Sequence, residues 1–197
     1  MPEDQGEDAK RCCGEAMSTL KEKIINEIIK REGGYVNDPS DSGAETMWGI
    51  TKKVARANGY HEPMHKLPRW LAFEIYEKRY LEKIKFDQIE KLSPLIAEEL
   101  ADTSVNMGWR RAGEFLQRSL NVLNRGGKDY KDLVVDGKVG AKTIKALKKY
   151  LKKRGKEGER VLHKMLNSLQ GSFYVTLAER RSKDEKFVFG WYKNRIA

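Results

Sequence analysis

The sequence predicts an all-α fold, and three observations carry that expectation. Apolar residues recur at spacings of three and four along most of the chain, which is the period of a helix with one buried face. Gly-Gly, Asn-Gly and Pro signals separate these segments, as they do where helices end or begin. The stretch from Tyr35 to Gly49 lacks a helical period, and it indicates a loop or a short hairpin.

The first helix has clear signals at both ends. Thr19 and Glu22 stand three apart, the spacing of a capping box, in which each side chain bonds the other residue's backbone N–H. The helix should continue to about Lys30 or Arg31 and stop at Gly33-Gly34. The residues expected on its apolar face are Leu20, Ile24, Ile25, Ile28 and Ile29.

Two helices should follow before the middle of the chain. A short one begins after Thr51 and ends at Asn58-Gly59, and Pro68 opens the next. The predicted buried residues of the second are Ala72, Ile75, Tyr76 and Tyr80.

The second half is also predicted to be helical. Helices are expected over 94–107, 110–123 and 142–153, with a loop over 126–135 between the last two. The 110–123 helix should bury Ala112, Phe115, Leu116, Leu120 and Leu123. A last long helix carries Leu162, Met165, Leu166, Leu169 and Phe173 at helical spacing.

The 197 residues suit one compact unit or two small, closely packed ones. A weak boundary near Ser93-Pro94 divides the chain into domains over 17–95 and 96–197. The polar, acidic segment 1–16 is expected to be a disordered tail, not a secretory signal. No apolar run approaches the roughly 20 residues of a transmembrane helix, so stable membrane insertion is not expected.

Cysteine and histidine usage disfavours cross-linked and metal-dependent folds. The two cysteines, Cys12 and Cys13, are adjacent, so the chain is not a disulfide scaffold and suits a reducing compartment. Three histidines without usable thiols disfavour a zinc site, and the Pro63 between His61 and His65 breaks the helix that would align them. We expect neither a metal nor a cofactor.

The formal net charge of +10 requires an anionic partner, which could be nucleic acid, acidic lipid or a cell envelope. One predicted helix face is strongly basic, and its residues are Lys145, Lys148, Lys149, Lys152 and Lys153, extended by Arg154 and Lys156. This face suits either an anionic envelope or simple solvation. Because no phosphate loop or aromatic nucleic-acid motif accompanies it, a nucleic-acid partner is disfavoured.

The densest chemical signal follows the first helix. Glu32 ends an apolar helix, where burial would raise the pKa of a carboxyl toward that of a general acid, and two glycines leave room for a polymer. Glycosidic cleavage usually needs a second carboxylate, and Asp41 lies nine positions on, with Thr46 five further. The same pattern is also typical of an exposed helix end followed by ordinary turn residues.

The stretch from Glu32 to Thr51 closely resembles the signature of glycoside hydrolase family 108, the N-acetylmuramidases of phage endolysins and toxin-secretion systems. The pattern Glu-Gly-Gly-Tyr, Asp-Pro, Asp, Gly, Thr, Gly-Ile-Thr is all present, and Ala44 departs from the family's usual second glycine. The resemblance implies that Glu32 is the catalytic residue. Asp41 and Thr46 further resemble the glutamate–aspartate–threonine set of phage-type lysozymes.

The second half resembles the partner domain of that family, a predicted peptidoglycan-binding domain. Its opening, middle and end match Asp102 to Gly108, Val135 to Gly140, and Glu185 to Trp191. The two resemblances together imply a lysozyme-like catalytic region packed against a helical C-terminal region, with a cleft between them. Tyr35, Asp38, Trp48 and Asn106 are then expected to bind substrate, although Tyr35 and Trp48 suit core packing nearly as well.

The resemblance implies hydrolysis of the bond between N-acetylmuramic acid and N-acetylglucosamine in bacterial peptidoglycan. A lytic transglycosylase and a non-catalytic, wall-binding secretion-accessory protein remain as alternatives. Without a recognisable signal, the chain is expected to be made in the bacterial cytoplasm. It would then act on the cell wall after release or export through a holin-like helper.

Overall fold

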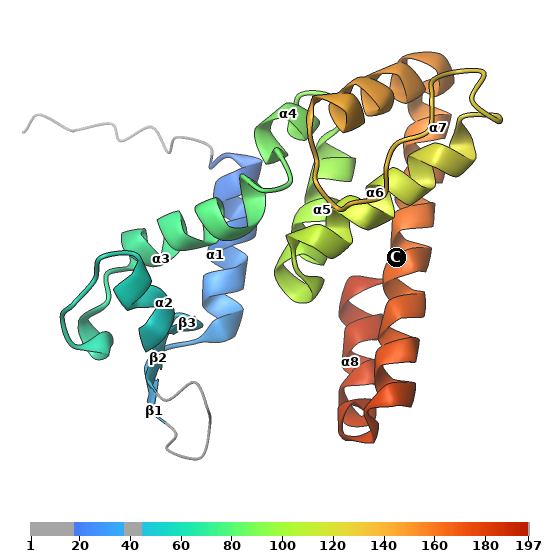
Figure 1. Ribbon diagram of the computed structural model, residues 1–197. Helices are drawn as coiled ribbons and strands as arrows, with labels where there is room; N and C mark the ends of the chain where they lie inside the picture. The colour runs from blue at the N-terminus through green and yellow to red at the C-terminus, as the bar shows by residue number, and fades with distance from the viewer. Residues whose placement is uncertain (1–17, 38–44, 197) are drawn as a thin grey trace, which may run out of the picture.

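A computed structural model of the protein describes residues 18–37 and 45–196 (Figure 1). The acidic segment 1–16, Asp38 and Asp41 lie outside these described residues. The fold is predominantly helical with one small sheet, which confirms the predicted all-α class.

The first region contains a helix, a three-stranded antiparallel sheet and a group of short helices. The hairpin expected between Tyr35 and Gly49 is part of this sheet, with strand order β1-β2-β3. Its elements are α1 (Leu20–Glu32), β1 (Val36–Asn37), β2 (Glu45–Met47), β3 (Ile50–Thr51), α2 (Lys52–Ala57), the 3-10 turn η1 (Met64–Lys66), α3 (Arg69–Tyr76), the π-helical turn η2 (Glu77–Leu81) and α4 (Phe86–Glu90).

The second region contains only helices and loops. Its elements are α5 (Pro94–Met107), α6 (Trp109–Leu123), α7 (Ala141–Arg180), the 3-10 turn η3 (Ser182–Asp184) and α8 (Glu185–Arg195). The two helices predicted on either side of residue 155 are joined into α7, where Gly155 forms a kink with φ 58° and ψ −149°.

Local signals account for most helix boundaries. The Thr19 hydroxyl accepts from the backbone N–H of Glu22 and the Glu22 carboxylate accepts from that of Thr19, so the predicted capping box is confirmed. Gly33, with φ 78°, ends α1 as predicted, and the last helical residue is Glu32, one or two positions beyond the expected end. Pro94 opens α5, and the Ser93 hydroxyl accepts from Ile96 N–H as its cap.

Some predictions of burial and of helices were wrong. Tyr80 and Leu123 are only partly buried, because each lies at the edge of its helix's apolar face. Helices α4 and α8 were not predicted. The five residues of α4 are too few to show a helical period, and α8 has no fully buried residue to mark an apolar face.

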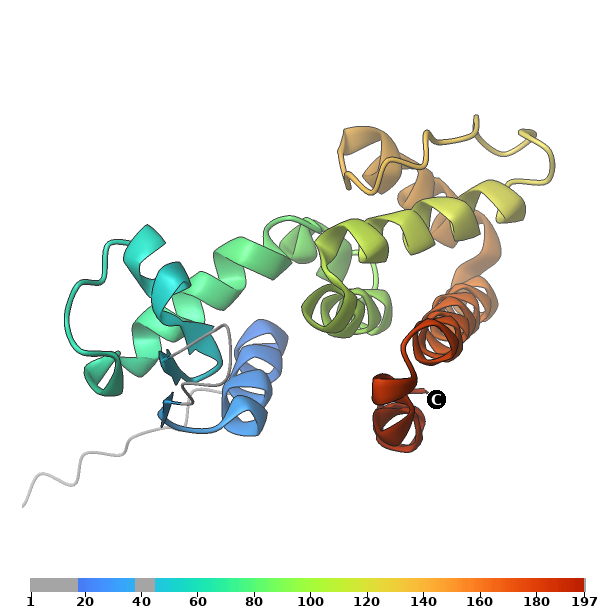
Figure 2. The ribbon, with the colours of Figure 1, turned by 60° about the horizontal axis from the view of Figure 1, so that its bottom comes forward.

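Helix α5 joins the two regions. It packs against α1 and α4 on one side and against α6 and α7 on the other. In Figures 1 and 2 the first region (blue to green) and the second (yellow to red) meet at this helix. Buried residues of both regions form one continuous core, from Ile25 to Leu166. The turn between α4 and α5 coincides with the weak boundary near Ser93-Pro94, and a division into two domains there remains a prediction.

Candidate active site

Glu32 is the last residue of α1, and its side chain is exposed rather than buried. The expectation of a carboxyl buried by the apolar helix was therefore wrong. The apolar face of α1 carries the buried Ile25 and Ile29, which pack into the core. Glu32 lies seven positions after Ile25, at the end of the helix. It is exposed because α1 leaves the core at this point.

A close approach of the sheet fixes the base of the Glu32 side chain. Gly49 has φ 73°, and a Cβ added there would lie 2.5 Å from Oη of Tyr76 and 2.8 Å from Cγ of Glu32. The Tyr76 hydroxyl donates to the carbonyl of Trp48 at 3.1 Å, which ties α3 to the turn. Only glycine fits both this conformation and this space. The Gly-Ile-Thr part of the motif therefore supports Glu32 from behind.

Tyr76 remains a hydrogen-bond donor in this arrangement. Burial raises the pKa of its hydroxyl well above the ordinary value, and the negative charge of Glu32 adds to that effect. A protonated Tyr76 can therefore hold the Trp48 carbonyl at neutral and moderately alkaline pH.

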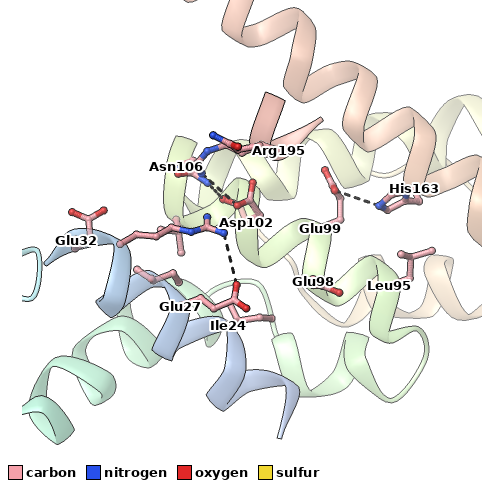
Figure 3. A pocket seen from close by; sticks show the side chains of 14 residues that line it. Ile24, Glu27, Glu32, Leu95, Glu98, Glu99, Asp102, Asn106, His163 and Arg195 are labelled. Atoms are coloured by element: carbon pink, nitrogen blue, oxygen red, sulfur yellow. Dashed lines mark hydrogen bonds and ion pairs between the residues drawn. The ribbon is translucent and has the colours of Figure 1, made fainter. Parts of the chain in front are cut away.

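A pocket of about 380 Å³ opens beside Glu32, between α1 on one wall and α5, α7 and α8 on the other (Figure 3). Glu32 and Asn106 line this same pocket, although they come from different regions. The lining residues are Ile24, Glu27, Ile28, Arg31, Glu32, Leu95, Glu98, Glu99, Asp102, Val105, Asn106, His163, Asn194 and Arg195. Both regions of the chain are thus needed to form the pocket.

A buried carboxyl, Glu99, lies in the α5 wall. It is 7% exposed, and its Oε2 accepts from Nδ2 of Asn167 at 2.7 Å. Burial, followed by the charge of Asp102, raises the pKa of Glu99 to about 8, and burial lowers the pKa of the adjacent His163. Glu99 and His163, whose nearest atoms are 3.5 Å apart, are therefore both neutral near pH 7, rather than a charged pair.

The residues named by the sequence are only partly brought together. The Tyr35 hydroxyl donates to Oε1 of Glu45 at 2.9 Å on the exposed side of the sheet. Thr46 is half-buried in β2, paired with Val36 and Thr51. The indole N–H of Trp48 donates to the Leu67 carbonyl at 3.1 Å, and its ring packs against the core. The pocket that contains Glu32 is lined by none of these three residues, Tyr35, Thr46 and Trp48.

Sequence reasoning missed Tyr76, Glu99 and Arg195 as parts of the site. Tyr76 was recognised only as a buried helix residue, because its spacing does not reveal where its hydroxyl points. Glu99 follows another glutamate in an ordinary amphipathic helix. Arg195 lies close to the C-terminus, and no local pattern relates it to α1. Within the described ranges, no group of three or more metal-binding side chains is present.

The described ranges also hold no helix with the length and apolar character that crossing a bilayer requires. No curated protein matches the sequence. A solved structure, titled "Structure of Brucella abortus SagA", is similar in fold, with a TM-score of 0.55 and 22% identity over 88% of this chain and 96% of that one.

Two family models match successive parts of the sequence. Residues 25–108 match the model of glycosyl hydrolase 108, and residues 111–196 match the model described as a predicted peptidoglycan domain. The first match contains Glu32, the Gly-Ile-Thr turn and helix α5, and the second contains α7 and α8 of the opposite pocket wall. The chain belongs to glycoside hydrolase family 108, a family of N-acetylmuramidases, and carries a C-terminal domain of the peptidoglycan-binding type.

Proposed function

We propose that Glu32 is the proton donor with which this glycosidase cleaves the bond between N-acetylmuramic acid and N-acetylglucosamine. The observation that carries the proposal is the position of Glu32. It is an exposed carboxyl at a helix end, its Cβ and Cγ lie close to Gly49, and it opens to a pocket that both regions line. A long glycan strand needs such an open groove, and a proton donor needs a fixed direction.

In the proposed reaction Glu32 protonates the oxygen that leaves with the cleaved sugar. The bond to the anomeric carbon then breaks, and positive charge develops on the sugar ring. Water adds to that carbon and loses a proton to Asp41 or to the Glu32 carboxylate, which gives a reducing muramic-acid end. Asp41 would activate this water or stabilise the charge, and Thr46 would position the water. Because free Glu32 is exposed, the bound glycan itself would have to exclude bulk water from the carboxyl.

The substrate also needs contacts away from the bond that is cleaved. Asn106 lines the pocket opposite Glu32, and its Nδ2 donates to the Asp102 carbonyl at 2.7 Å. That bond leaves its amide oxygen available to accept from a sugar or acetamido group. Tyr35, Asp38 and Trp48 would contact more distant sugars of the strand. We further propose that the protein is made in the bacterial cytoplasm and reaches the wall through a holin-like helper.

Digestion of purified peptidoglycan tests the role of Glu32. Wild type, Glu32→Gln and the control Glu62→Gln, which changes an exposed carboxylate outside the pocket, would be compared at equal concentration, with fragments analysed by mass spectrometry. We expect reducing muramic-acid ends from wild type and from the control. Glu32→Gln should lose at least about a hundredfold in rate, because general acid catalysis contributes that much.

Other outcomes would identify the alternatives. Anhydromuramic ends would identify a lytic transglycosylase, in which Asp41→Asn would have little effect. Folded wild type that binds sacculi but releases no fragments would favour a wall-binding, secretion-accessory role. Equal activity of Glu32→Gln and wild type would refute Glu32 as the donor.

A further inference from the structure

Helix α8 packs against α7 through aromatic side chains. The Trp191 ring stacks on Tyr174 with centroids 4.7 Å apart, and on Phe187 at 5.9 Å. The Tyr192 hydroxyl lies directly over Gly171, where an added Cβ would approach it to 2.9 Å. The glycine and the aromatic residues thus fix where the end of α8 lies. Its last turn places Asn194 and Arg195 in the wall of the Glu32 pocket.

Arg195 is oriented by an anchored carboxylate on α5. Its Nη1 lies 3.4 Å from Oδ1 of Asp102, and the other oxygen of Asp102 accepts from Nε2 of Gln170 at 2.8 Å. Gln170 is fully buried, so Asp102 has a fixed position from which to hold the guanidinium. Figure 3 shows Arg195 beside Asp102 and Asn106, with Glu32 on the other side of the pocket.

The Arg195 guanidinium keeps most of its binding capacity. It has five N–H donors, and Asp102 is its one hydrogen-bond acceptor among residues 18–37 and 45–196. The side chain is 21% exposed and lines the pocket, so part of it is accessible there. On the opposite wall Arg31 lies 3.8 Å from Glu27, its ion-pair partner among the described residues. Since His163 is neutral near pH 7, Arg195 is the cation on the wall formed by α5, α7 and α8.

We propose that Arg195 binds a carboxylate of the stem peptide that substitutes muramic acid, so that the enzyme selects peptide-bearing strands over bare glycan. This inference rests on the proposed function, because it assigns a specificity to the same pocket. A guanidinium fork matches a carboxylate in a bidentate contact. The amides of Asn106 and Asn194 beside it suit the amide groups of the stem and of the acetamido substituent. Arg195 is a binding residue here and takes no part in proton transfer.

The test compares two substrates with the full-length protein. The substrates are soluble glycan strands that carry stem peptides, and the same strands after an amidase has removed the peptides. The proteins are wild type, Arg195→Ala, Arg195→Lys and the control Lys193→Ala, which removes an exposed cation two residues away that does not line the pocket. Values of kcat and KM are measured for each pair.

We expect Arg195→Ala to raise KM about tenfold on peptide-bearing strands, since one charge-assisted hydrogen bond has about that effect. The kcat of this variant and its KM on stripped strands should match those of wild type. Unchanged values on stripped strands would also show that the variant is folded. Arg195→Lys should recover part of the loss, and Lys193→Ala should behave as wild type.

Two results would overturn the inference. If Arg195→Ala raised KM equally on both substrates, or on neither, Arg195 would not read the stem peptide, while muramidase activity would stand. If wild type hydrolysed neither substrate, the proposed function would fail and this inference with it. Should Arg195→Ala not fold, the comparison of Arg195→Lys with wild type on the two substrates decides in the same way.

Discussion

Replacing Glu99 by Gln should stabilise the protein at neutral and alkaline pH. The side chain is 7% exposed, and its Oε1 has no hydrogen-bond partner among the described residues. Folding raises the pKa of this carboxyl from the ordinary 4.5 to about 8. The folded state therefore binds a proton that the unfolded chain has released, and stability falls as the pH rises between these two values.

The magnitude follows from the shift. Each pKa unit corresponds to about 1.4 kcal/mol, so the penalty is near zero at pH 4, about 3 kcal/mol at pH 7 and at most about 5 kcal/mol above pH 8. Gln is neutral at every pH and similar in shape, and its carbonyl can still accept from Asn167. The gain of Glu99→Gln over wild type should thus grow with pH. His163 titrates in both proteins and largely cancels in the difference.

Urea unfolding at pH 4, 7 and 8.5, followed by circular dichroism, measures these free energies. Glu179→Gln, an exposed change on α7, is the control and should alter the free energy of unfolding by less than about 0.5 kcal/mol. Equal or lower stability of Glu99→Gln at pH 8.5 would refute the reasoning. It would mean that Glu99 is ionised in the folded protein and satisfied there by a cation.

Two further predictions concern the support of Glu32 and the basic face of α7. Gly49→Ala should lower the free energy of unfolding by about 2–4 kcal/mol and also reduce kcat, because the new Cβ combines positive φ with contacts to Glu32 and Tyr76. The control is Gly59→Ala, because Gly59 also has a positive φ, 84°, but has open space around it. This change should lower the free energy of unfolding by only about 1 kcal/mol and leave kcat unchanged. Equal effects of the two changes on urea unfolding and on turnover would contradict the packing argument. Changing exposed Lys148 and Lys152 together to Glu should weaken co-sedimentation with sacculi severalfold at ~50 mM salt and much less at ~500 mM, while hydrolysis of soluble strands persists. Binding that ignores both the substitutions and the salt would assign this face to solvation alone.

Helix boundaries could be predicted because their signals are local. The capping box of Thr19, the Gly33 stop and Pro94 after Ser93 act on backbone groups within a few residues, so reading the chain in order finds them. Helix α8 was missed because its stability comes from Trp191 against Tyr174, residues of two different helices. The family motif was recognisable because Glu32, Gly49 and Thr51 lie in one short stretch.

The sequence by itself determined the helical class and most helix ends, because these depend on spacing along the chain. It also identified the residue proposed to donate the proton, because that residue lies in a short family motif. Only the tertiary structure decided how that residue is surrounded. Burial depends on which distant segments pack against a side chain, so Glu32 is exposed although its helix is apolar, and Glu99 is buried although a glutamate precedes it. The same long-range packing, through α5 and the aromatic contacts of α8, brings Arg195 to the pocket of Glu32.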